Sequence, residues 1–131
     1  MVQGIGKGSV GEIGEDIACA YLARKGYRIR HRNYRRKTGE IDIVAECSGV
    51  LHFIEVKSST FGGTNNISRE IKSLGPEELI NELKIARVSR TAQWYVEEFR
   101  WGGDVQIDAL IVVLDRNKKV ARCRYYPQIL G

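Results

Sequence analysis

The sequence predicts an α/β fold, built as a single α+β domain with a mixed sheet in the order αβββαββ. The chain has 131 residues, the size of one ordinary domain. Its hydrophobic residues (43%) and charged residues (28%) are in the proportions typical of a chain that folds. Helical periodicity at two places, with β-rich runs between and after them, predicts helices packed on a sheet. We find no internal repeat or linker, so residues 1–131 are expected to form one domain.

The first helix is predicted by a capping box formed by Ser9 and Glu12. At a separation of three residues, the side chain of each can bond the backbone N–H of the other. Apolar residues then recur at helical spacing until Gly26, namely Val10, Ile13, Ile17, Ala18, Tyr21 and Leu22. A strand is expected from Tyr27 to Arg35, and Lys37-Thr38-Gly39 after it is a turn signal.

Two further β-rich runs, Glu40 to Glu46 and Leu51 to Ser58, are joined through Cys47-Ser48-Gly49. This pattern is typical of a β-hairpin. Residues 59–75 are polar and carry Gly62-Gly63 and Asn65-Asn66, so we expect a long mobile loop there. Loops of this length in a compact domain are usually functional or disordered.

A second helix is expected from about Asn81 to Arg100, with one apolar stripe that includes Val88, Ala92 and Tyr95. The apolar run from Gln106 to Leu114 has the length of a strand covered on both faces. A turn at residues 115–118 leads to a last strand that ends at Tyr125.

Several classes of protein are disfavoured by composition. The longest apolar run, Ala109 to Leu114, is far too short to span a bilayer, and the N-terminus has no secretory signal pattern. We therefore expect a cytoplasmic protein. Three cysteines, Cys19, Cys47 and Cys123, are widely separated and lack the histidines of a zinc site, which favours reduced thiols in the core.

Positive charge is concentrated in one stretch, although the net charge is only +5. Eight Lys or Arg residues and no acid lie between Arg24 and Lys37, interleaved with aromatic and amide side chains. Such a surface suits the phosphates of a nucleic acid, whereas the alternative is a solvated basic face without a ligand. The residues expected to contact DNA, including a stripe on the second helix, are Arg28, Arg30, Arg32, Arg35, Arg36, Lys37, Lys84, Arg87 and Arg90.

The main candidate site is the pair of strands that carry Asp42, Glu55 and Lys57. These charges stand in otherwise apolar strands, where an ionised group must be paired or bind a metal. The two-residue period places Glu55 and Lys57 on one face, and a hairpin brings Asp42 beside Glu55. Two carboxylates suit Mg²⁺ or Mn²⁺ better than zinc. The alternative is a hairpin face held by salt bridges without a metal.

A fourth carboxylate comes from the first helix. On a helical wheel Glu15 lies at the border of the apolar stripe, so it can lean toward the sheet. Glu12 lies nearly opposite the centre of the stripe and is better used in the cap.

The sequence resembles the YraN family of small bacterial proteins regarded as endonucleases. That family is similar to the archaeal Holliday junction resolvases and to the PD-(D/E)xK nuclease superfamily. The resemblance is strong over residues 9 to 57 and is carried by Gly11-Glu12-Ile13-Gly14-Glu15-Asp16-Ile17-Ala18, Asn33-Tyr34-Arg35, Gly39-Glu40-Ile41-Asp42 and Glu55-Val56-Lys57. Ile41 stands where the superfamily has the proline that names it.

The resemblance implies a restriction-endonuclease-like core and hydrolysis of DNA phosphodiester bonds. It implies that Asp42 and Glu55 ligate Mg²⁺ or Mn²⁺, that Lys57 assists the attacking water, and that Glu15 adds a carboxylate through a water or a second metal. Because contacts to phosphates position DNA without reading bases, cleavage is expected to be nonspecific or to select a structure such as branched DNA. Junction-cutting relatives act as symmetric pairs, so a homodimer is to be tested.

Two other functions fit the sequence. The first is a non-catalytic nucleic-acid-binding module on the same fold, with a structural acidic cluster. The second is a protein-interaction adaptor with Trp94 and Trp101 as anchors, although tryptophans are more often core residues.

Overall fold

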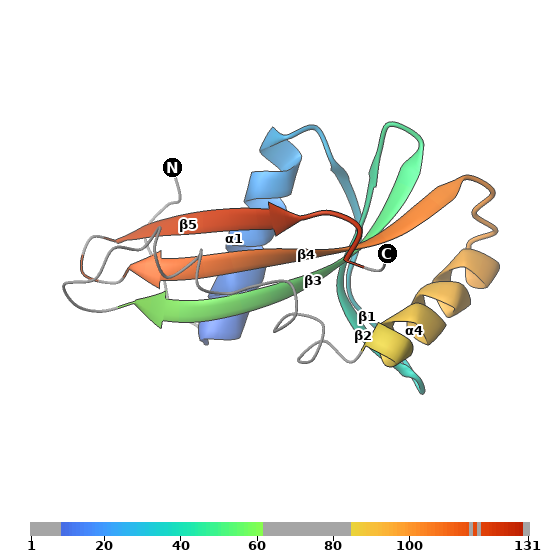
Figure 1. The fold of residues 1–131 in the computed structure, drawn as a ribbon, viewed down its shortest axis with the longest axis horizontal. Helices are drawn as coiled ribbons and strands as arrows, with labels where there is room; N and C mark the ends of the chain where they lie inside the picture. The colour runs from blue at the N-terminus through green and yellow to red at the C-terminus, as the bar shows by residue number, and fades with distance from the viewer. Residues whose placement is uncertain (1–8, 62–84, 116, 118, 130–131) are drawn as a thin grey trace.

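The computed structural model describes residues 9–61, 85–115, 117 and 119–129. The described elements confirm the predicted order αβββαββ (Figure 1). They are α1 (Val10–Arg24), β1 (Arg28–Arg36), β2 (Gly39–Cys47), β3 (Val50–Phe61), α4 (Ile85–Glu98), β4 (Asp104–Asp115) and β5 (Val120–Tyr126).

The described strands form one five-stranded mixed sheet in the order β1-β2-β3-β4-β5. β3 and β4 pair in parallel, and the other neighbours pair antiparallel. A parallel pair cannot be joined by a tight turn, and the segment between β3 and β4 includes α4. The mixed α+β architecture expected from the sequence is therefore confirmed.

The start of the predicted loop is wrong. Residues 59 to 61 continue β3, where Ser59 pairs with Val113 and Thr60 with Leu114 of β4. Ser59 and Thr60 are polar and precede Gly62-Gly63, which is typical of a loop, but pairing with the long apolar β4 keeps the backbone extended. The rest of the predicted 59–75 loop lies outside the described residues.

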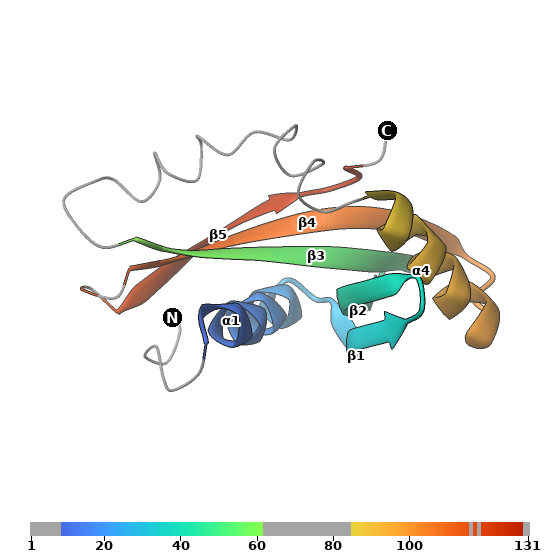
Figure 2. The ribbon, with the colours of Figure 1, turned by 90° about the horizontal axis from the view of Figure 1, so that it is seen from below.

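Among the described elements, α1 covers one face of the sheet and α4 the other (Figure 2). Ile17 and Leu22 of α1 pack against a core that includes Ile54 and Leu110 of the sheet. On the opposite face, α4 contributes to a second core. This second core consists of Tyr34, Ile41, Val44, Leu51, Phe53, Val88, Ala92, Tyr95 and Ile107. The sheet is therefore the middle layer of three.

The predicted N-cap of α1 at Ser9 is confirmed. Ser9 Oγ accepts a hydrogen bond of 3.1 Å from the backbone nitrogen of Glu12, and it lies 3.2 Å from Glu12 Oε1. Further along α1, Gly14 packs directly on β3, because a Cβ at this position would lie only 1.7 Å from Ser58 Oγ. α1 thus approaches the sheet most closely next to the strand that carries Glu55 and Lys57.

The second predicted helix is present as α4, and the expected residues face the core. Val88, Ala92 and Tyr95 are buried, together with Thr91. Trp94 is 48% exposed and therefore does not belong to the core, whereas Trp101 packs against it. Residues 81–84 of the predicted helix lie outside the described residues.

The three cysteines are free, as expected, but each is only half-buried. Cys19 and Cys123 lie against the α1 side of the core rather than inside it. Among the described residues, no helix is long and apolar enough to cross a membrane.

Candidate metal and phosphodiester site

The predicted site lies where β2 and β3 separate. Their antiparallel pairing ends at Ile43 and Ile54. Beyond that point the Asp42 carboxylate takes the place of a backbone acceptor, because its Oδ2 accepts a hydrogen bond of 2.8 Å from the backbone nitrogen of Val56. Figure 1 shows β1 and β2 turning away from β3, β4 and β5. The fork in the sheet thus holds Asp42 at its base.

Glu55, Lys57 and Ser59 occupy one face of β3. Side chains alternate along a strand, and Ile54 and Val56 pack toward α1. The intervening odd-numbered positions therefore point to the opposite face, as Phe53 does in the core beside α4. The predicted pairing of Glu55 and Lys57 on one face agrees with this arrangement.

Two buried polar atoms in this row have no hydrogen-bond partner. They are Glu55 Oε1 and Ser59 Oγ, and no other buried side-chain nitrogen or oxygen within the described ranges lacks one. They stand on either side of the half-buried Lys57 in the sequence of β3. Native proteins leave few buried polar groups unsatisfied, and such groups are costly unless a ligand completes them.

Three carboxylates influence one another at the fork. Burial and the nearby Asp42 carboxylate raise the pKa of Glu55 far above its ordinary value. Burial also raises the pKa of Asp42, although the Val56 backbone nitrogen opposes this effect. The pKa of Glu15 on α1 is raised by burial and then by Asp42. Glu55 therefore keeps its proton at neutral pH unless a cation offsets the charge of the neighbouring Asp42.

The residues at the fork fit a divalent cation bound mainly by two carboxylates. Among the described side chains, no group of three or more His, Cys, Asp or Glu could hold a metal ion. Mg²⁺ commonly uses one or two carboxylates and completes its shell with waters and substrate phosphate. Asp42 and Glu55, with the unpaired Oε1 of Glu55, suit that requirement. Glu15 adds negative charge beside them rather than a third ligand.

The arginines of β1 have carboxylate partners within the chain. Arg28 and Arg30 pair with Glu46, at 3.6 Å and 3.2 Å. The other pairs are Arg32 with Asp16 at 2.8 Å and Glu15 at 3.7 Å, Arg35 with Glu40 at 3.0 Å, and Arg36 with Glu98. Exposed ion pairs contribute little to stability, so most of these arginines can exchange a carboxylate for a phosphate at small cost.

The predicted DNA contacts outside β1 have no described ion pair, and Arg30 is the least exposed of the β1 arginines. Lys37, Arg87 and Arg90 are exposed, and within the described part of the chain they form no ion pair. Arg30 is largely covered, and its guanidinium lies over the rings of Tyr95 and Trp101. Lys84 lies outside the described residues. Three exposed cations without a described ion pair therefore lie on α4 and in the β1–β2 turn.

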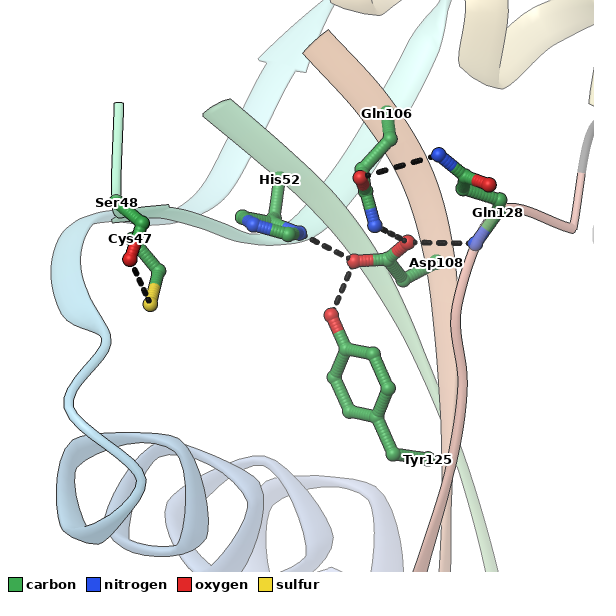
Figure 3. A network of polar contacts seen from close by, with 7 residues as sticks. All are labelled: Cys47, Ser48, His52, Gln106, Asp108, Tyr125 and Gln128. Carbon is green, nitrogen blue, oxygen red and sulfur yellow. Dashed lines mark hydrogen bonds and ion pairs between the residues drawn. The ribbon is translucent and has the colours of Figure 1, made fainter. Parts of the chain in front are cut away.

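A second buried polar cluster was not predicted from the sequence (Figure 3). Asp108 of β4 is fully buried and hydrogen-bonds His52 Nδ1 at 2.6 Å and the Tyr125 hydroxyl. Its other oxygen accepts hydrogen bonds of 2.8 Å from Gln106 Nε2 and the Gln128 backbone nitrogen. The sequence did contain a signal for this cluster, because His52 and Asp108 stand within otherwise apolar strands. Because every partner is present, the cluster ties β3, β4 and β5 together.

Comparison with known proteins places the chain in a family. Residues 14–113 match the model of "Uncharacterised protein family UPF0102". A UPF0102 protein of Thermotoga neapolitana is 39% identical over 94 residues, which cover 72% of this chain and 78% of the relative. A UPF0102 protein of Persephonella marina is 38% identical over 104 residues, 79% of this chain and 82% of the relative.

A third relative extends the match. The UPF0102 protein of Alkaliphilus metalliredigens is 37% identical over 114 residues, which cover 86% of this chain and 91% of the relative. The matched range of the family model contains Glu15, Asp42, Glu55 and Lys57. The chain therefore belongs to the UPF0102 family, the YraN family that its motifs resemble.

Proposed function

We propose that this protein is a metal-dependent endonuclease of the PD-(D/E)xK type that hydrolyses DNA phosphodiester bonds. One observation carries the proposal: the buried Glu55 carboxylate has an oxygen without a partner, beside Asp42 at the fork of the sheet. A purely structural carboxyl pair in a core would be expected to satisfy all of its oxygens. The three-layer arrangement with the site at the strand fork supports a restriction-endonuclease-like core.

Asp42 and Glu55 would hold Mg²⁺ or Mn²⁺. The bound ion would supply Lewis-acid stabilisation of the phosphate and a water of lowered pKa. The Val56 backbone nitrogen fixes one oxygen of Asp42, so this carboxylate is already oriented. Glu15 adds negative charge that favours a cation at this place over a proton.

Lys57 and Ser59 would act on the phosphate. Negative charge increases on the phosphate oxygens as water attacks, and the Lys57 ammonium lies on the same face of β3 as Glu55 to stabilise it. The Ser59 hydroxyl, which has no partner in the described structure, would donate a hydrogen bond to a phosphate oxygen. Burial of this row limits the water that competes for these contacts.

A non-catalytic DNA-binding protein is the second candidate, and the raised pKa of Glu55 favours it. If Glu55 keeps its proton, the Asp42–Glu55 pair can be a structural hydrogen bond. In that case the basic residues would still bind DNA without cleaving it. The two candidates make opposite predictions for metal-dependent cleavage.

The test uses linear duplex, single-stranded and four-way branched DNA, each with Mg²⁺, Mn²⁺ or EDTA. We expect cleavage only with metal, and a loss of at least about a hundredfold in rate for Asp42→Asn and Lys57→Ala, since each removes a group that acts on the transition state. Asp104→Asn, an exposed carboxylate at the start of β4, is the matched control and should cleave normally. Cleavage in EDTA, or full activity of Asp42→Asn, would contradict the assignment.

The same experiment addresses substrate and assembly. Faster cleavage of the branched substrate would indicate structure selection, because the phosphate contacts carry no base information. Light scattering at the assay concentration shows whether the active species is the proposed homodimer. Binding of all three DNAs without any cleavage would favour the non-catalytic protein.

A further inference from the structure

A hollow on the outer surface of α4 is not used by the proposed reaction. It is lined by Thr38 of the β1–β2 turn and by four residues of α4, namely Arg90, Gln93, Trp94 and Glu97. We call it the α4 hollow. Its helix residues recur at the spacing that places side chains on one side of a helix, opposite the buried Val88, Ala92 and Tyr95. Trp94, which is 48% exposed, supplies its aromatic surface.

The two walls of the α4 hollow are fixed to each other. Thr38 Oγ1 lies 2.7 Å from Thr91 Oγ1, and Thr91 also donates a hydrogen bond of 2.9 Å to the Arg87 carbonyl. The backbone at Gly39 approaches α4 so closely that a Cβ there would lie 3.4 Å from Thr91 Oγ1, with a φ of +147° that favours glycine. The turn and the helix therefore present a preformed surface.

Three basic residues lie at or next to this hollow. Arg90 lines it, and Lys37 is next to Thr38 in the turn. The Arg87 side chain lies beside Gly39, where a Cβ would come within 3.6 Å of Arg87 Cβ. All three are exposed, and no ion pair with a described residue neutralises them. A polyanion would find here cations that need not leave another partner.

We infer that the α4 hollow binds an unpaired nucleotide of a DNA strand, with the base stacked on Trp94 and its phosphates held by Arg90, Arg87 and Lys37. Exposed aromatic rings stack on bases of any sequence, but a base within a duplex offers no open face. The Gln93 side-chain amide can donate and accept hydrogen bonds at the edge of such a base, and the Glu97 carboxylate can accept one. Glu97 also repels phosphate, so the backbone should pass on the side of Arg90.

A second copy of the chain fits this surface less well. A stable interface buries about 800 Å² per partner and has an apolar centre. Trp94 is the one large apolar side chain of the α4 hollow, and four polar residues surround it. The other exposed large apolar side chains lie elsewhere: Val105 and Val120 belong to β4 and β5, and Phe99, just after α4, packs against the buried Tyr95.

The position of the hollow suits a substrate of the proposed nuclease, on which this inference rests. Extended chain rises about 3.3 Å per residue, so Thr38 lies about 13 Å along the chain from Asp42. That distance is a few nucleotides of a strand. A DNA with unpaired nucleotides near the cleaved bond, such as a branch or a flap, could then engage the fork and the α4 hollow together.

The test measures binding rather than cleavage, so that it remains informative if the protein does not cut DNA. Asp42→Asn protein in EDTA is titrated with a fluorescein-labelled thymidine 12-mer and with a blunt duplex of the same length, and anisotropy is read. We expect Trp94→Ala to weaken single-strand binding about tenfold, Trp94→Phe to restore most of it, and duplex binding to change less than twofold. Arg90→Gln should lower the salt slope for the single strand by about 0.7.

Matched controls lie on β5, where Val120→Ala and Arg122→Gln change exposed residues away from α4 and should bind as the parent does. Equal single-strand affinity of Trp94→Ala and the parent would overturn the inference. An equal loss of duplex affinity would also overturn it, since the hollow would then hold DNA without requiring an unpaired base. Dissociation of a dimer by Trp94→Ala with unchanged DNA binding would assign the surface to a second copy instead.

Discussion

Replacing Glu55 by Gln tests the physical basis of the candidate site without relying on cleavage. Glu55 is 8% exposed, and burial together with Asp42 raises its pKa to about 10. In the unfolded chain the same carboxyl titrates near pH 4.3. Between these values the folded state keeps a proton that the unfolded state has lost, so the metal-free protein must lose stability as pH rises. Gln cannot titrate, yet its amide can still donate to Asp42.

The expected loss of unfolding free energy follows from the one proton by which the folded and unfolded states differ. Each pH unit between the two pKa values costs the folded state up to about 1.4 kcal/mol. Between pH 5.5 and 7.5 the free energy of unfolding of the wild type in EDTA should therefore fall by up to about 2.7 kcal/mol relative to Glu55→Gln. A divalent cation that binds the ionised pair should offset this loss, by about 2.7 kcal/mol at a hundred times its dissociation constant.

The assay is urea unfolding of both proteins at pH 5.5, 6.5 and 7.5, in EDTA and in Mg²⁺. The wild type should show the falling profile in EDTA and a gain with Mg²⁺ that grows with pH, whereas Glu55→Gln should show neither. Parallel pH profiles in EDTA would refute the claim that Glu55 holds its proton in the fold. Equal stabilisation of both proteins by Mg²⁺ would refute its assignment as a ligand.

Two further changes test the packing and the polar core. Gly14→Ala should lower the free energy of unfolding by about 1–3 kcal/mol, because its methyl group overlaps Ser58, and urea unfolding of the Gly14→Ala, Ser58→Gly double variant should show partial recovery. Asp108→Ala should lower the free energy of unfolding by about 3–5 kcal/mol, because it leaves several buried donors without their acceptor. Tyr125→Phe should lower it by only about 1–2 kcal/mol. Thermal melts should show that order, and equal effects would contradict the network.

Much of the fold could be predicted because local signals and packing agree. Ser9 and Gly26 mark the ends of α1, and the turns before Gly39 and around Ser48 separate strands that then pair as neighbours. The end of β3 could not be predicted in this way. Ser59 and Thr60 are polar and precede Gly62-Gly63, and only the parallel partner β4, distant in the sequence, makes residues 59 to 61 a strand.

Some features of the candidate site could likewise be predicted from local sequence, and others could not. The two-residue period was enough to place Glu55 and Lys57 on one face of β3, and the helical wheel was enough to select Glu15 over Glu12. Which arginines are paired could not be read from the sequence. Arg36 meets Glu98 of α4, and Arg32 meets Asp16 of α1, so each pairing depends on how a helix packs on the sheet. A cluster of cations in the sequence therefore overstates the positive charge available to DNA.

β3 contacts or carries two buried carboxylates whose hydrogen bonding differs, Asp108 and Glu55. His52 of this strand contacts Asp108, whose two oxygens accept four hydrogen bonds inside the core. Glu55 stands on the same strand and is similarly buried, yet its Oε1 has no partner and its neighbour is a second carboxylate. The same sheet thus supplies hydrogen-bond partners for both oxygens of Asp108 but none for Glu55 Oε1. Because a buried oxygen without a partner costs stability, the arrangement at the fork supports the proposed metal, which would supply that partner.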